Sequence, residues 1–196
     1  MGESGGGVRR FEVPGAGCQL SGAGSPEKRK SFLRTKSKRL NNSTPQLKQM
    51  IEIKNLENSS DFHHPRRVMK YVLVYCSSGH ITMLVDEKEF NIETGQLITI
   101  TSGQVHHITK SRKGKGFILE FTLDFFCKDD KDIELIFHNG LFCHFAMNEV
   151  IPADKEILTT QLSLIQQELN EQPYQYLISI HSRIELILVA INRAKV

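Results

Sequence analysis

The stretch from about residue 50 to residue 122 is a series of short apolar runs separated by turn residues. Residues 71–76, 97–100 and 117–122 are rich in β-branched and aromatic side chains. Runs of this kind with Gly, Ser, Thr or Asp between them are typical of an all-β sandwich or barrel. We predict a mainly β fold, with hairpin turns at 77–79 and 86–89 and a further strand at 142–147.

After Pro152 the apolar spacing changes from two residues to about 3.6, the period of an amphipathic helix. One helix is predicted to run to Gln172 and a second from about residue 174 to residue 193. Two helices exceed what a small barrel needs for cover, so we predict that the second forms a dimer interface. Its predicted interface residues are Leu177, Ile180, Ile184, Leu188 and Ile191. Periodicity leaves open the alternative that both helices only cap their own barrel.

The N-terminal part has a different composition. Residues 1–24 contain eight of the 14 glycines and few large apolar residues, so they bury too little surface to offset the entropy of ordering. Residues 27–39 carry seven basic side chains, which could form a nucleic-acid arm or an import signal, or simply a solvated tail. We predict a disordered tail over 1–48, a barrel over 49–148 and a helical pair over 149–196.

The net charge of +3 conceals an asymmetry between the tail and the rest of the chain. Residues 1–50 carry ten Lys or Arg against three Asp or Glu, and the remainder carries fifteen against nineteen. The predicted domain therefore lacks the clustered basic residues of a nucleic-acid-binding surface. Its apolar runs are far shorter than the roughly 20 residues of a membrane span. Four cysteines without a CxxC pair fit free thiols, so we expect a cytoplasmic protein without membrane contact.

The segment 95–107 reads Gly-Gln-Leu-Ile-Thr-Ile-Thr-Ser-Gly-Gln-Val-His-His. It resembles the second signature of the cupin family, a glycine, five residues and then Pro-x-Gly-x-x-His, with Thr101 in place of the proline. In that pattern Gly95 turns into a strand, Gly103 turns out of it, and His106 points into the barrel. The Gly-x-x-His-His ending is still closer to sensor domains of the arabinose-regulator (AraC) type.

The resemblance extends over residues 62–193, through the 116–121 strand, Phe125-Phe126 and the two terminal helices. It implies a cupin double-stranded β-helix, a jelly-roll barrel, followed by two C-terminal α-helices. It also implies the ligand-sensing and dimerisation domain of a transcription regulator. Such regulators bind DNA through a C-terminal domain with helix-turn-helix motifs. Since the sequence stops at Val196, DNA contact is expected only through a missing C-terminal domain.

Metal-dependent cupins bind their ion with a His-x-His pair and a glutamate from the first signature. If Gly79 closes that signature here, Val72 occupies the glutamate position and the histidine positions fall within 65–68, where no histidine stands. A catalytic metal needs three or more imidazole or carboxylate ligands, and His106 has only His63 and His64 as displaced companions. We therefore predict no metal, no cofactor and no enzymatic activity. The alternative is a metal-dependent cupin dioxygenase or isomerase.

A small-molecule effector, with a sugar as one candidate, is expected at the barrel mouth, and a homodimer is expected as the assembly. By strand phase the predicted ligand-binding residues are His64, Tyr71, Leu73, Ile100, His106 and Leu119. His106 has two readings. As a neutral imidazole it hydrogen-bonds the ligand, or it is a core histidine bonded to a neighbouring strand.

Overall fold

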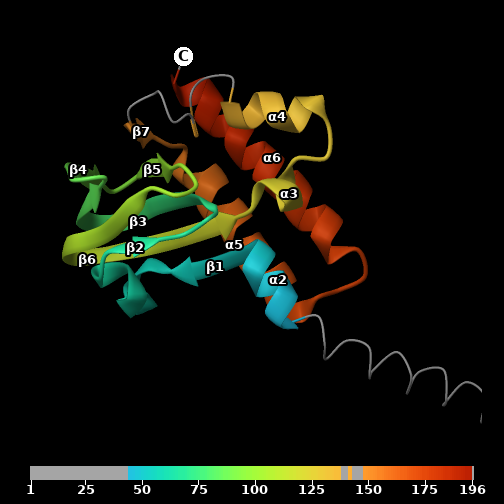
Figure 1. Cartoon of the computed structure of the whole chain (residues 1–196), viewed down its shortest axis with the longest axis horizontal. Coiled ribbons are helices and arrows are strands. Elements are labelled where there is room, and N and C mark those ends of the chain that lie inside the picture. The colour runs from blue at the N-terminus through green and yellow to red at the C-terminus, as the bar shows by residue number, and fades with distance from the viewer. Residues whose placement is uncertain (1–43, 138–140, 143–147, 196) are drawn as a thin grey trace, which may run out of the picture. The chain divides into compact units, whose positions relative to one another are not determined.

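The structure, a computed structural model, describes residues 44–137, 141–142 and 148–195 (Figure 1). Most of the predicted tail lies outside these residues. Its last part does not, because helix α2 (Thr44–Met50) begins inside the segment predicted as tail. Leu47 of this helix packs into the apolar core, which explains why regular structure starts earlier than the composition of residues 1–48 indicated.

Within these described residues, seven strands form one antiparallel sheet, which confirms the predicted mainly β class. The strands are β1 (Ile51–Asn55), β2 (Arg66–Arg67), β3 (Tyr71–Val85), β4 (Lys88–Glu93), β5 (Gln96–Ile100), β6 (Val105–Phe121) and β7 (Val150–Pro152). Their order is β1-β6-β3-β5-β7, with β2 paired to β6 and β4 paired to β3. The short helices η1 (Leu56–Asn58) and η2 (Ser60–His63) connect β1 to β2.

The predicted turn at 77–79 is wrong, because β3 continues through it as one long strand paired with β6. The register shifts between Cys76 and His80, and Gly79 there has φ of +79°. A β-bulge of this kind bends a strand and changes which face its side chains point to. Val74 before the bulge and Ile81 after it consequently face the same apolar core. The predicted hairpin after Val85 is confirmed.

The curled sheet separates two apolar cores. The lumen core, inside the barrel, contains Leu56, Phe62, Val72, Val74, Cys76, Ile81, Met83, Val85, Ile92, Ile98, Ile100, Ile108 and Ile118. The helix-side core is defined by strand residues Tyr71, Leu73, Tyr75, Leu97, Leu119 and Phe121 and the helical residues that cover them. Since neighbouring residues of a strand point to opposite faces, β3 and β6 contribute alternately to both cores.

Both predicted C-terminal helices are confirmed, as α5 (Lys155–Glu171) and α6 (Tyr176–Lys195). The carboxylate of Asp154 caps α5 by accepting from the backbone N–H groups of Glu156 and Ile157. Two shorter helices that the sequence did not indicate, α3 (Leu123–Phe126) and α4 (Asp130–Phe137), follow β6. Figure 1 shows the helices gathered at one side of the sheet, with β4 and β5 at the other. Of the predicted strand 142–147, Phe142 lies in a turn and the rest is outside the described residues.

The predicted dimer stripe on α6 needs correction. Ile180, Ile184, Leu188 and Ile191 are fully buried in the helix-side core of their own chain, and only Leu177 of the predicted set is exposed. The 3.6-residue spacing of the apolar residues indicates that the helix has one apolar face, but it does not determine which surface that face packs against. In this structure the face covers the barrel, which was the alternative left open by the sequence.

Candidate functional site

His106 lies near the start of β6, between Arg66 of β2 and Val85 of β3. Its side chain is buried, with 1% of the residue exposed. The Nδ1 atom is 3.1 Å from the carbonyl oxygen of Gln104. Because a carbonyl only accepts, Nδ1 carries the proton and Nε2 presents a lone pair. Among the residues that the structure describes, this buried Nε2 has no hydrogen-bond partner.

Burial lowers the pKa of His106 below its usual value. The hydrogen bond to Gln104 opposes this change, the charge of Arg66 adds to it, and the carboxylates of Glu120 and Asp86 oppose it. The lowered pKa favours a neutral imidazole at physiological pH. Its Nε2 is therefore an acceptor that is ready for a donor group.

Glu120 lies on the lumen side of β6, two residues from Ile118, and its side chain is buried. Arg66 Nη1 is 2.7 Å and Lys70 Nζ is 3.7 Å from its carboxylate oxygens. The guanidinium carbon of Arg66 also lies 4.2 Å from the centroid of the Phe62 ring. A buried carboxylate needs such partners, since an unpaired charge inside a protein is costly.

These contacts join four residues from three elements, η2, β2 and β6, into one group. The Phe62 ring from η2 lies 5.8 Å, centroid to centroid, from the His106 ring. We name Phe62, Arg66, His106 and Glu120 the barrel-end cluster. It combines an unpartnered acceptor at His106 with a charged donor and a charged acceptor that already pair with each other. Such a mixture of donors and acceptors around an aromatic ring suits recognition of a polar small molecule.

A hydrogen-bond network fixes the strand start that carries His106. The side-chain Nε2 of Gln104 donates hydrogen bonds to Asp86 Oδ2 and to Asn148 Oδ1, each at a distance of 2.9 Å. Asp86 Oδ1 in turn accepts from the backbone N–H of Val105 at 2.9 Å. Asp86 has φ of +44° and Glu87 φ of +69°, so the β3–β4 turn uses two left-handed non-glycine residues. Gln104 thereby ties this turn to the segment that holds His106.

The structure does not bring the six predicted ligand-binding residues together. Ile100 and His106 are on the lumen side, whereas Tyr71, Leu73 and Leu119 face the helices. His64 is exposed at the end of η2. The assumed strand phase was wrong, because Ile100 pairs directly with Val72, which places Tyr71 and Leu73 on the opposite face.

Sequence reasoning missed three members of the barrel-end cluster, namely Phe62, Arg66 and Glu120. For Glu120 a signal was present, since it is the one charged residue in the apolar run 117–121. Charged residues are rarely buried without a partner, so such a position indicates a buried ion pair. No comparable signal marks Phe62 or Arg66, which lie in the short elements η2 and β2 between β1 and β3.

Within the described ranges, one group of three side chains has the composition of a metal site, formed by Asp132, His181 and Glu185. His181 Nε2 is 2.8 Å from the carbonyl oxygen of Phe126 and 3.1 Å from Asp132 Oδ2. Facing these two acceptors, Nε2 carries the proton, so the contacts of this group are hydrogen bonds. The group ties α6 to the α3–α4 segment, and it lies on the helix side of the sheet, away from the lumen.

A family comparison covers both the barrel and the helices. The profile of the AraC-like ligand binding domain matches residues 50–178, more than half of the chain. The chain belongs to this family. The predicted resemblance to AraC-type sensor domains is therefore confirmed, together with the expected barrel. A comparison with curated proteins finds no match.

Two solved structures are similar to this AraC-like ligand binding domain. The AraC-like transcriptional activator CuxR has 11% sequence identity and a TM-score of 0.40, over 63% of this chain and 44% of CuxR. ToxT from Vibrio cholerae has 9% identity and a TM-score of 0.42, over 73% of this chain and 55% of ToxT. The chain thus spans about half the length of each neighbour.

Other features of the AraC-like domain bear on its surroundings. No helix of the described residues is both long and apolar enough to cross a membrane. Cys76 and Cys127 are free thiols, and burial raises the pKa of both. Cys18 and Cys143 lie outside the described residues.

Proposed function

We propose that this AraC-like domain senses a small molecule for a transcription regulator, and that the barrel-end cluster binds the effector. The observation that supports this most is the buried Nε2 of His106, an acceptor without a partner within the described chain, beside the Arg66–Glu120 pair. An unsatisfied polar atom at a buried position costs free energy, and such a cost is often retained where function requires it. A ligand donor would satisfy it.

The chemistry of the cluster favours a neutral molecule with several hydroxyl groups. His106 and Glu120 accept hydrogen bonds, Arg66 donates them, and the Phe62 ring offers an apolar face. A hydroxyl both donates and accepts, so one ligand could use all three polar groups. A sugar, the candidate named from the family, fits this description. Because the apolar lumen side chains are buried, the ligand must favour a slightly opened state, which is how binding shifts a conformational equilibrium.

Thermal unfolding of the whole chain tests this proposal with pentoses and hexoses, L-arabinose among them. A ligand that binds only the folded state raises the midpoint by mass action. We expect a rise with at least one sugar in the wild type and none in His106→Phe or Glu120→Gln. His107→Phe, a change of the neighbouring residue on the outer phase of β6, is the control that keeps the response. If no sugar raises the midpoint, or if both cluster variants respond like the wild type, the proposal is wrong.

The dimer predicted from the sequence stays a proposal, now on a different face of α6. Ile178 is 63% exposed and Leu186 54% exposed, and both lie on the side of α6 that points away from the barrel. Leu177, from the predicted set, is 39% exposed at the start of the same helix. Apolar side chains repeated on the outer face of one helix are suited to packing against the same helix of a second copy.

Sedimentation velocity decides the dimer proposal. The wild type should sediment as a dimer, and Ile178→Asp combined with Leu186→Asp should sediment as a monomer with an unchanged thermal midpoint. Ser163→Asp, an exposed position on α5, is the matched control and should remain dimeric. A monomeric wild type at all concentrations refutes the proposal, as does a double variant that still dimerises.

The absence of enzymatic activity is proposed from the family, whose named neighbours are regulatory proteins. The competing metal-enzyme function would need an ion held at His106. Elemental analysis of the purified protein distinguishes the two functions. Iron, manganese or zinc in near-stoichiometric amount, lost in His106→Ala, would favour the enzyme. Contact with DNA and a cytoplasmic location likewise rest on the family alone.

A further inference from the structure

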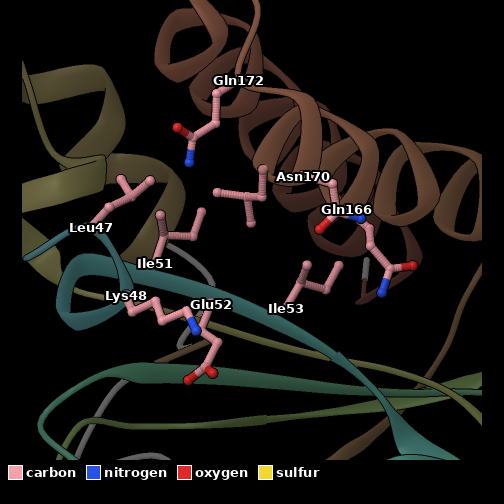
Figure 2. Close-up of a pocket in the computed structure, with 9 residues that line it drawn as sticks. Leu47, Lys48, Ile51, Glu52, Ile53, Gln166, Asn170 and Gln172 are labelled. Atoms are coloured by element: carbon pink, nitrogen blue, oxygen red, sulfur yellow. The ribbon is translucent and has the colours of Figure 1, made fainter. Parts of the chain in front are cut away.

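A second candidate site lies outside the barrel. A groove of about 260 Å³ separates the α2–β1 segment from the C-terminal end of α5. Figure 2 shows Leu47, Lys48 and Glu52 on one side of this groove and Asn170 and Gln172 on the other. Its volume is below the range of sites for drug-sized ligands, so its occupant must be a small metabolite.

The floor of the groove is aliphatic. It is made by Leu47, Ile51 and Ile53 from the α2–β1 segment and by Leu169 from α5. Ile51 and Leu47 belong to the helix-side core, and Ile53 and Leu169 pack against it. A branched aliphatic group placed on this floor would be removed from water, at a gain of about 25 cal/mol per Å² of apolar surface buried.

The rim of the groove is polar, and much of its hydrogen-bonding capacity is unused. The side chains of Lys48, Asn170 and Gln172 have no hydrogen bond or ion pair within the part of the chain that the structure describes. Gln166 uses only its amide nitrogen, which donates to Asn55 Oδ1 at 3.3 Å. Three amide groups therefore remain available to a ligand that both donates and accepts hydrogen bonds.

Two charged side chains line the same side of the groove (Figure 2). Lys48 places an ammonium group at the rim. Glu52, the second residue of β1, contributes a carboxylate, of which Oε1 is 3.4 Å from Lys54 Nζ. The C-terminus of α5 adds negative potential, since its last turn has no basic residue and a helix C-terminus carries partial negative charge. The groove therefore favours a ligand with one anionic and one cationic group.

From this arrangement we propose that the groove binds a free α-amino acid with a branched aliphatic side chain. Its carboxylate would face Lys48, its ammonium group would face Glu52 on the same side of the groove, and its side chain would lie on the aliphatic floor. The proposal does not depend on the barrel-end cluster. It gives the domain a second small-molecule site, next to the turn at Gln172 that leads into α6.

Isothermal titration of the full chain with three related compounds tests the ligand chemistry. L-leucine carries both charges, 4-methylpentanoate lacks the ammonium group, and 3-methylbutylamine lacks the carboxylate. We expect L-leucine to bind one site per chain and each of the other two to bind at least about fivefold more weakly, the value of one partly exposed charge interaction. No L-leucine binding, or equal binding of all three, overturns the proposal.

Substitutions of residues that line the groove test whether L-leucine binds there. Lys48→Met and Glu52→Gln should each weaken L-leucine binding about fivefold, and Asn170→Trp, which fills the groove from an exposed position, should abolish it. Lys110→Met, an exposed lysine of β6, is the control with unchanged affinity. Unchanged binding in all three groove variants refutes the site. Loss of L-leucine binding in His106→Phe, with the groove variants unaffected, would assign the amino acid to the barrel instead and also refute it.

Discussion

At the scale of single residues, His106 contributes to how the stability of the domain depends on pH. In the unfolded chain it binds a proton near its usual pKa of 6.5, and burial lowers the pKa in the folded chain. Below pH 6.5 the unfolded state therefore binds more protons than the folded state. Stability from this residue is complete above that pH, and it falls as the pH falls towards the folded-state pKa.

We accordingly expect the free energy of unfolding of the wild type to fall more than that of His106→Gln between about pH 7 and about pH 5. Urea unfolding at a series of pH values measures the difference. Glutamine keeps a polar group at the site but does not titrate, and the other histidines are common to both proteins. Parallel pH profiles would show that His106 is not protonated on unfolding in this range.

For the Arg66–Glu120 ion pair, we predict that removing the charge of Arg66 alone lowers stability more than removing both charges. Arg66→Met leaves a buried carboxylate with only Lys70 at 3.7 Å, and it should lower the free energy of unfolding by about 2 kcal/mol. Adding Glu120→Gln removes the unpaired charge, so the double variant should be more stable than Arg66→Met alone. Chemical denaturation of the four proteins gives the coupling energy. A double variant less stable than either single variant would mean that the pair is not coupled in this way.

At the scale of elements, the bulge in β3 is testable through two glycines with nearly the same backbone angle. Gly79 has φ of +79° and Gly95 has φ of +81°. An added Cβ at Gly79 would meet the backbone carbonyl of Lys113, whereas at Gly95 it would meet nothing within 4 Å. Gly95→Ala should cost about 1 kcal/mol for the left-handed conformation, and Gly79→Ala about 3 kcal/mol. Equal losses on thermal unfolding would show that the two strands do not approach closely at the bulge.

For helix α6, we compare the stability effects of substituting one buried and one exposed residue. Ile184 is fully buried in the helix-side core and Leu186 is mostly exposed. Ile184→Ala should lower the free energy of unfolding by about 3 kcal/mol, and Leu186→Ala should change it by less than about 0.5 kcal/mol. Urea denaturation at a low protein concentration separates this effect from dimer dissociation. The reverse order would place the opposite face of α6 against the barrel.

Elements of regular period were predictable from sequence, and elements set by tertiary contacts were not. The apolar run that begins at Leu97 and the stripe around Ile184 identified β5 and α6 because local sequence determines both. The bulge at Gly79 has the same local composition as a hairpin turn, and only the pairing of β3 with β6 decides between them. Leu73 was put on the wrong face for a related reason, since only the pairing of Val72 with Ile100 fixes which residues of β3 share a face with Ile100.

At the scale of the whole molecule, the two cores depend on different parts of the chain. Helix α6 supplies Ile180, Ile184, Ile187, Leu188 and Ile191 to the helix-side core. A chain that ends at Gln172 would expose the apolar strand residues they cover, so it should lose cooperative unfolding and well-dispersed amide signals. Calorimetry and a proton–nitrogen NMR spectrum test this. A sharp transition in the shortened chain would show that the barrel is stable without α6.

Strands β3 and β6 are one layer of backbone with a separate core on each side. Val72 and Leu73 are neighbours in the chain, yet one lies inside the barrel and the other beneath the helices. A ligand that pushes the side chains of the lumen core outward must therefore displace the backbone of β3 and β6, against which the helices pack. A change in the lumen that binding causes would therefore reach the helices through a single layer of backbone.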